Sequence, residues 1–208
     1  EEVVMSLDGK IVDHGVRLKP RKLKGASLAE IDAERQLKGC ENPGGGERLY
    51  ALTRLTVTPK HGGQVWYPGG LIVEDFVVHI KARLAAPEIH VEAETTLCVP
   101  ARLDRLGQAE RKAWWRFYKE LEKQQQAQVR RGLEAAEALL QDLQELTVTL
   151  QSETVNEDKL REKSLGLLKQ AAQAEFCNGQ IDARMAAALG QPQALAPPLG
   201  LYPEPAHA

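Results

Sequence analysis

The chain has 208 residues, in which 27 Lys and Arg stand against 29 Asp and Glu, for a formal net charge of -2. This length is sufficient for one domain with a hydrophobic core. The balanced charge provides no positive surface for phosphates, so nucleic acid is not an expected partner. The apolar runs are far shorter than the roughly 18 residues that a membrane-spanning helix needs, so no membrane span is expected.

The first half of the chain is expected to be mainly β-structure with one short helix. Ser27 and Glu30 have the spacing of a capping box, and Gly39 follows as a helix stop, which predicts a helix over residues 28–38. A glycine-rich loop follows this helix. Residues 49–58 then favour a strand.

The clearest β-strand pattern lies in residues 71–99, where apolar and polar residues alternate. Two strands folded about the loop 85–88 would form an antiparallel hairpin in which apolar residues pair on one face and polar residues pair on the other. In this register His79 and His90 lie about 13 Å apart, too far to share a metal ion. The expected pairs are Ile80 with Ala93, Phe76 with Leu97, Lys81 with Glu92 and His79 with Glu94.

The second half of the chain is expected to consist of long helices. Residues 108–150 contain no proline and a single glycine, Gly132, so they predict one long helix that could bend at this glycine. One face of this helix is expected to be buried, because its apolar residues recur every three or four positions. The members of this line are Trp114, Phe117, Leu121, Gln124, Gln128, Ala135, Leu139, Leu143 and Leu146.

A further helix is expected near the C-terminus. Thr154 and Glu157 resemble a second capping box, which predicts a helix that runs toward Phe176 or on to Leu189. The last residues, 191–208, are rich in proline and small side chains, so they predict an extended tail.

The expected fold class is therefore α+β, with an N-terminal antiparallel sheet and one short helix, followed by long C-terminal helices. Residues 1–190 are expected to form a single domain and residues 191–208 the proline-rich tail. Cys40, Cys98 and Cys177 lack the CxxC spacing of a zinc or redox motif. Two states remain open for them: three reduced, buried thiols, or one disulfide with one free thiol.

One stretch of the long helix combines an apolar framework with a run of glutamines. Its pattern is Trp114-xx-Phe117-xxx-Leu121-xx-Gln124-Gln125-xx-Gln128. This pattern resembles the Trp-xx-Phe-xxx-Leu-xx-His-Glu-xx-His helix of the exported bacterial zinc-dependent protease family that was first described as a domain of unknown function. Other segments resemble the same family in the same order: Lys24-Gly25-Ala26-Ser27-Leu28-Ala29-Glu30-Ile31, Thr53-Arg54, Val99-Pro100 and Ile181-Asp182.

The resemblance implies a zincin-like fold and a periplasmic or secreted protein whose signal peptide has been removed. It also implies roles that the glutamines cannot fill, because Gln124 and Gln128 replace zinc-binding histidines and Gln125 replaces the general base. A neutral amide is a weak metal ligand and has no proton-accepting carboxylate. The late His-Gly of the family, with a presumed third ligand, falls on Ala187-Ala188. We therefore predict no catalytic residue, no bound metal and no cofactor.

The predicted function is that of a catalytically inactive zinc-peptidase homologue, a pseudoprotease, which binds a protein or peptide in the bacterial envelope. Gln124, Gln125 and Gln128 would line the remaining substrate cleft, and the strand that faces it could pair with an extended peptide. The same glutamines could instead form a solvated polar patch on the helix.

Two other classes of function remain open. The first is an active hydrolase with a relocated, non-zinc site that uses Asp or Glu with one of the histidines His14, His61, His79 or His90. No Ser/His/Asp or Cys/His order supports it, and the glycines of 42–46 lack the Lys-Ser/Thr of a phosphate-binding loop. The second is a structural assembly protein that uses the long helix or the proline-rich tail.

Overall fold

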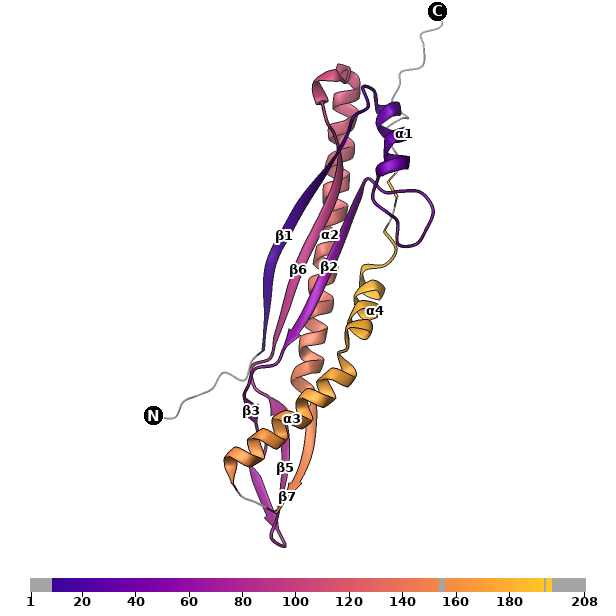
Figure 1. The fold of residues 1–208 in the computed structure, drawn as a ribbon. Coiled ribbons are helices and arrows are strands. Elements are labelled where there is room, and N and C mark those ends of the chain that lie inside the picture. The colour runs from indigo at the N-terminus through magenta and orange to yellow at the C-terminus, as the bar shows by residue number, and fades with distance from the viewer. Residues whose placement is uncertain (1–8, 154–155, 193, 196–208) are drawn as a thin grey trace, which may run out of the picture. The chain divides into compact units, whose positions relative to one another are not determined.

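The computed structural model describes residues 9–153, 156–192 and 194–195, and it confirms an α+β fold with an N-terminal sheet and C-terminal helices (Figure 1). The chain divides into two compact units, and the boundary between them falls within β1, β2, β6 and α2. Unit 1 comprises Glu1–His14, Thr56–Glu92 and Leu133–Ala188, and unit 2 comprises Gly15–Leu55, Ala93–Gly132 and Leu189–Ala208.

Two sheets are present among the described residues. In the first, β6 (Glu88–Pro100) is the central strand between β1 (Lys10–Leu23) and β2 (Ala51–Lys60). The predicted strand over 49–58 corresponds to β2. Its last residues include Pro59, which an edge strand accommodates because one side of the strand needs no N–H donors.

The second sheet belongs to unit 1 and is built around β5 (Val77–Leu84). This strand pairs antiparallel with β3 (Val65–Trp66), β4 (Leu71–Glu74) and β7 (Thr147–Ser152). Its inward residues Val78 and Ile80 pack with Leu160 of the C-terminal half, which gives this sheet a core of its own.

The predicted hairpin between residues 71–84 and 88–99 is wrong. The chain turns earlier, at Asp75 and Phe76, whose φ angles of 48° and 64° lie in the left-handed region. Phe76 was expected to face Leu97, but it lies in this turn with 95% of its surface exposed. A strand with alternating apolar and polar residues can pair with any strand of the same pattern. Here β5 pairs with β4 and β7 and not with β6. The observed partners of Ile80 are Leu71 and Leu150, and those of His79 are Ile72 and Gln151.

The first predicted helix is confirmed as α1 (Leu28–Lys38). The Ser27 hydroxyl accepts a hydrogen bond from the Glu30 N–H at 3.2 Å, as the capping box predicts. The Glu30 carboxylate accepts from the N–H of Ala26 at 2.7 Å, one residue before the expected donor. A short 3₁₀ helix, η1 (Leu103–Arg105), precedes the next long element.

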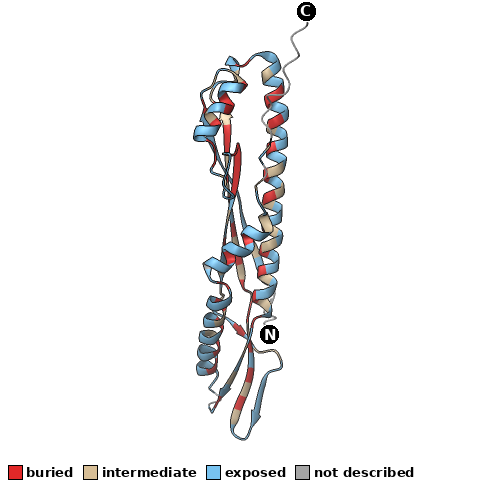
Figure 2. Ribbon diagram, turned by 90° about the vertical axis from the view of Figure 1, so that its right-hand side faces the viewer, coloured by how far each residue is buried: buried red, intermediate tan, exposed pale blue. Residues whose placement is uncertain are grey.

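The long predicted helix is present as α2 (Gln108–Glu145), but its predicted last turn is wrong. Residues 147–152 form β7, because the β-branched run Thr147-Val148-Thr149 fits a pleated strand that pairs with β5. All members of the predicted core line are buried or half-buried, and Figure 2 shows buried positions recurring along the helix.

The C-terminal helical region is split into α3 (Glu157–Glu175) and α4 (Asn178–Leu189). The cap of α3 is Asn156, whose side chain accepts from the Lys159 N–H at 3.0 Å, and the predicted cap Thr154 lies outside the described residues. Of the predicted tail 191–208, residues 193 and 196–208 also lie outside the description. Leu195 packs against the core of unit 2.

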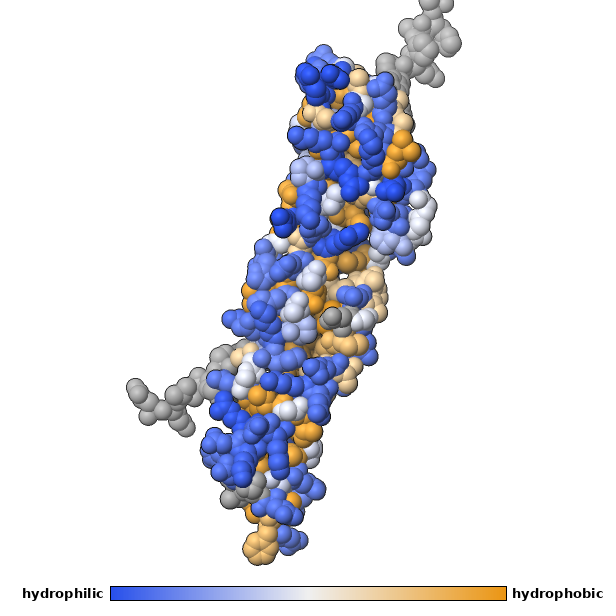
Figure 3. Space-filling view, in the orientation of Figure 1, coloured by the Kyte–Doolittle hydropathy of each residue, from blue (hydrophilic) through white to orange (hydrophobic). Residues whose placement is uncertain are grey.

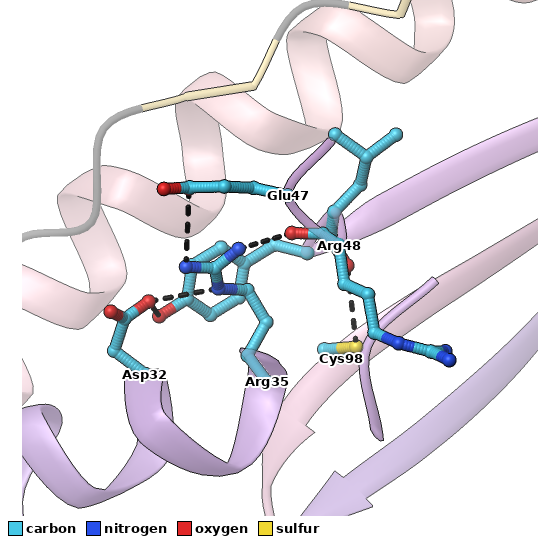
Figure 4. A network of polar contacts seen from close by, with 7 residues as sticks. Asp32, Arg35, Glu47, Arg48 and Cys98 are labelled. Carbon is cyan, nitrogen blue, oxygen red and sulfur yellow. Dashed lines mark hydrogen bonds and ion pairs between the residues drawn. The ribbon is translucent and has the colours of Figure 1, made fainter. Parts of the chain in front are cut away.

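The core of unit 2 is built on an aromatic cluster. The Tyr50 ring lies edge-on to Phe117, with ring centroids 4.8 Å apart, and to Trp114, with centroids 6.0 Å apart. Beside it the Arg35 side chain, 3% exposed, donates to Asp32 at 2.8 Å and to the carbonyl oxygen of Arg48 (Figure 4). Burial and the hydrogen bond to Asp32 raise the pKa of Tyr50, so this hydroxyl stays protonated and donates to the carboxylate.

Candidate functional site

The three glutamines of the degenerate motif lie on the part of α2 that belongs to unit 2. Gln125 and Gln128 are buried, with 6% and 7% of their surface exposed, and Gln124 is half-buried. One turn of helix separates Gln124 from Gln128, which places both on one face. Gln125 faces the sheet, where it contacts Thr53.

Gln125 is joined to the sheet of unit 2 by hydrogen bonds. The hydroxyl of Thr53, in β2, donates to the amide oxygen of Gln125 at 2.8 Å. Thr53 and Thr95, in β6, are 2.7 Å apart, and because the Thr53 proton is already donated, Thr95 is the donor of this second bond. The Gln125 side chain is therefore a hydrogen-bond acceptor in a buried polar chain.

A pocket of about 290 Å³ lies beside this polar chain, between α2 and the strands β1 and β6. Its walls are mainly apolar, and Gln125 and Thr95 contribute polar groups. The exposed Val16 and Leu18 of β1 form one wall. The full lining is Val16, Leu18, Thr95, Leu97, Tyr118, Glu122, Gln125, Gln126 and Val129.

The prediction that Gln124, Gln125 and Gln128 line one cleft can be compared with this pocket. Of the three, Gln125 lines the pocket, and the other two are absent from its lining. Residues of α2 that the sequence reasoning missed are Tyr118, Glu122 and Val129. These residues are four and seven positions apart, so the period of the helix places them in a second stripe beside the core line.

The histidines proposed for a relocated active site lie in unit 1. His90 is placed between His14, with ring nitrogens 2.9 Å apart, and Glu88, 3.0 Å from its other ring nitrogen. His79 pairs within the β5 sheet. Burial, and then the charge of Lys169, lower the pKa of His61. Among the described residues no group of three or more His, Cys, Asp or Glu side chains could hold a metal ion.

Unit 1 also has a larger pocket, of about 610 Å³, where the end of α2 meets β7, α3 and α4. Three carboxylates line it, those of Asp142, Glu145 and Glu175, together with Arg184, which is paired with Asp142 at 2.5 Å. Neither a histidine nor a cysteine is among its lining residues.

The cysteines differ from the expectation in one respect. All three are free thiols, and Cys40 and Cys98 are buried, but Cys177 is exposed. Helices in the described part of the chain are too polar or too short to cross a membrane. Ile181-Asp182 and Ala187-Ala188, which carry the late part of the family resemblance, belong to α4 of unit 1.

Comparison with known proteins adds no relative to this picture. No protein-family profile, no curated protein and no solved structure matches the chain.

Proposed function

We propose that the chain is a catalytically inactive relative of the exported zinc-dependent proteases, which binds an extended protein or peptide segment in the bacterial envelope. The binding site is the apolar pocket between α2 and β1, together with the edge strand β1. The observation that carries this proposal is the combination of a buried Gln125 with a solvent-accessible apolar pocket directly beside it.

The hydrogen bonds of Gln125 support the loss of catalysis. A general base must have a free lone pair aimed at a water molecule, whereas the amide oxygen of Gln125 accepts from Thr53. Thr53 itself lies in the segment Thr53-Arg54 that carries part of the resemblance. The residue after this segment, Leu55, packs on α2 at Gly132, where a Cβ atom would lie 2.7 Å from the Leu55 side chain. This segment thus contacts the helix that carries the glutamines.

The geometry of β1 supports binding of an extended chain. In the described part of the chain it lies at the edge of its sheet, with β6 as its neighbour. A peptide added to this edge would place alternate side chains on the face where Val16 and Leu18 border the pocket. A volume of about 290 Å³ accommodates one or two apolar side chains.

The first test is zinc binding, measured by calorimetric titration and by the metal content of protein purified without chelator. We expect no binding heat and substoichiometric zinc, because amides replace both histidine positions. One tightly held zinc per chain would overturn the proposal.

A second candidate function is assembly through the β4–β5 hairpin, and a specific observation favours it. Leu71, Ile72 and Val73 of β4 are 43–58% exposed and Phe76 in the turn is 95% exposed. Hydrophobic atoms reach the surface at this hairpin in Figure 3. Exposed apolar surface of this kind is typical of interaction sites.

The two surfaces can be separated with one matched pair of variants. A peptide is selected from a displayed library of random ten-residue sequences and titrated by fluorescence anisotropy against Leu18→Glu and Phe76→Glu. We expect Leu18→Glu to weaken binding at least about tenfold, because a carboxylate would be placed at an apolar wall, and Phe76→Glu to leave it unchanged.

The reverse result would assign binding to the β4–β5 hairpin and support the assembly function. Equal affinity of both variants and the unaltered chain would contradict the pocket as the binding site. Thermal unfolding of each variant serves as the control for folding.

A further inference from the structure

A second, chemically different pocket lies in unit 2 and is unrelated to the degenerate motif. Side chains alternate along a strand, so Thr53 and Thr95 face α2, whereas Arg54 and Thr96 face the opposite side of the sheet. A pocket of about 380 Å³ opens there. It is lined by Lys19, Arg21, Cys40, Glu41, Arg48, Leu52, Arg54, Glu94 and Thr96.

Two thiols meet at this pocket. Cys40 follows α1 and forms an isolated backbone β-bridge with Leu49. Cys98, in β6, donates its N–H to the carbonyl oxygen of Tyr50 at 2.7 Å. Both cysteines therefore lie next to the segment 49–50. The Cys98 thiol donates to the carbonyl oxygen of Leu49 at 3.8 Å, and the same oxygen accepts from the Cys40 N–H at 2.9 Å. The Cys40 thiol donates to the carbonyl oxygen of Thr96 at 3.7 Å. Cys40 lines the pocket, whereas Cys98 is fully buried.

The pocket is cationic, with four basic side chains against two carboxylates. Arg21 donates to the carbonyl oxygens of Lys38 and Gly39 at 2.7 and 2.9 Å, and Arg48 donates to that of Gly39 at 3.0 Å. Neutral carbonyls hold these guanidinium groups in place, and Arg48 is in addition ion-paired with Glu41 at 3.6 Å. Lys19 is the cation most closely neutralised, at 2.5 Å from Glu94.

The same surroundings make the two thiols unequal. The neighbouring Cys98 side chain and the charges of Arg21 and Arg54 lower the pKa of Cys40, while burial opposes this shift. The neighbouring Cys40 side chain and burial raise the pKa of Cys98. A thiolate is the attacking species in disulfide exchange, and Cys40 is the thiol that lines the pocket, so Cys40 is the nucleophile and Cys98 the resolving thiol.

We propose that Cys40 and Cys98 form a thiol–disulfide exchange site whose substrates are small disulfides that carry carboxylate groups. The cationic pocket binds the carboxylates and brings the disulfide to the Cys40 sulfur. This site is independent of the peptide-binding function, because the two pockets share no lining residue.

The exchange takes place in two balanced steps. The Cys40 thiolate attacks one sulfur of the small disulfide, which forms a mixed disulfide and releases one small thiolate. Cys98 then attacks the Cys40 sulfur, forms the Cys40–Cys98 disulfide and releases the second small thiol, while the Cys98 proton passes to a released thiolate. The protein dithiol is oxidised and the small disulfide is reduced to two thiols.

The test uses the full chain with Cys177→Ser, which removes the exposed thiol. The reduced protein is incubated with oxidised glutathione, which is anionic, and in parallel with cystamine, which is cationic, and the products are identified by mass spectrometry. We expect an intramolecular disulfide, seen as the loss of two hydrogen atoms, at a rate about tenfold or more higher with oxidised glutathione. Added Cys98→Ser should stop the reaction at one glutathione on Cys40, and added Cys40→Ser should leave Cys98 unmodified.

A pair of charge variants separates the pocket from the thiols. Arg54→Gln removes a charge that lines the pocket, and Lys60→Gln removes one on the same strand outside it. We expect the rate with oxidised glutathione to fall at least about threefold in Arg54→Gln and to stay unchanged in Lys60→Gln. Equal reaction rates of the two variants, or equal rates with the two reagents, would overturn the proposal. An unfolded chain would also react at equal rates, so the expected difference requires the folded pocket. Modification of Cys98 in Cys40→Ser would overturn the assigned order.

Discussion

Replacing Arg35 with methionine is expected to lower the free energy of unfolding by about 3–5 kcal/mol, measured by urea denaturation. The Arg35 guanidinium is buried, donates to Asp32 at 2.8 Å and lies 5.1 Å above the centre of the Tyr50 ring (Figure 4). Its loss leaves the carboxylate of Asp32, 8% exposed, without a counter-charge and the carbonyl oxygen of Arg48 without this donor. An uncompensated buried charge costs far more than the ion pair itself contributes.

A double variant tests whether the unpaired carboxylate causes the defect. Asp32→Asn/Arg35→Met, which has no unpaired charge, should regain part of the loss.

The matched control for Arg35 is Lys38→Met on the same helix. Lys38 pairs with Glu34 at 2.9 Å, but its side chain is 63% exposed, so its loss should cost less than about 1 kcal/mol. If Arg35→Met were destabilised by no more than this control, the buried network would not be a main contributor to the stability of unit 2.

Replacing Gln125 with glutamate is expected to lower the free energy of unfolding at pH 7 by about 2–4 kcal/mol. This change introduces the residue type that the resembled protease family has at this position. The side chain would remain 6% exposed and would accept from Thr53 at the hydrogen-bond distance of 2.8 Å, but it would carry a charge without a cation beside it. The neutral acid keeps this hydrogen bond at no such cost.

Urea denaturation as a function of pH tests the sign of this effect. Burial raises the pKa of a carboxyl group above its unfolded value of about 4.3, so the variant should match the unaltered chain near pH 3 and lose stability as the pH rises. Gln126→Glu is the control, because the next residue on the same helix is exposed. We expect this control to lower the free energy of unfolding by less than about 0.5 kcal/mol. Equal stability of Gln125→Glu at both pH values would mean that water reaches this side chain, as an open active-site cleft would allow.

The parts of the fold that could be predicted are those with local signals. The capping box of Ser27 and Glu30 predicted α1, because both partners lie within one helical turn. The apolar line of α2 predicted which face of the helix is buried, including the inward position of Gln128. Such patterns depend on the period of the helix and hardly on what covers it.

Strand pairing and the sites could not be predicted in the same way. Alternation in β5 is compatible with several partners, and the choice of β4 and β7 depends on a turn at Asp75 and Phe76 and on a strand far along the chain. The β-branched Thr147 and Val148 are compatible with a strand, but only pairing with β5 ends the helix before them.

The amino-acid sequence by itself therefore determined the fold class and the positions of the main helices. Only the tertiary structure decided that Gln125 is bound by Thr53, that Val16 and Leu18 border a pocket, and that Cys40 and Cys98 both bind the carbonyl oxygen of Leu49. The physical reason is range: a helix face is specified by neighbours three or four residues apart, whereas these contacts join segments whose separation the local pattern does not encode.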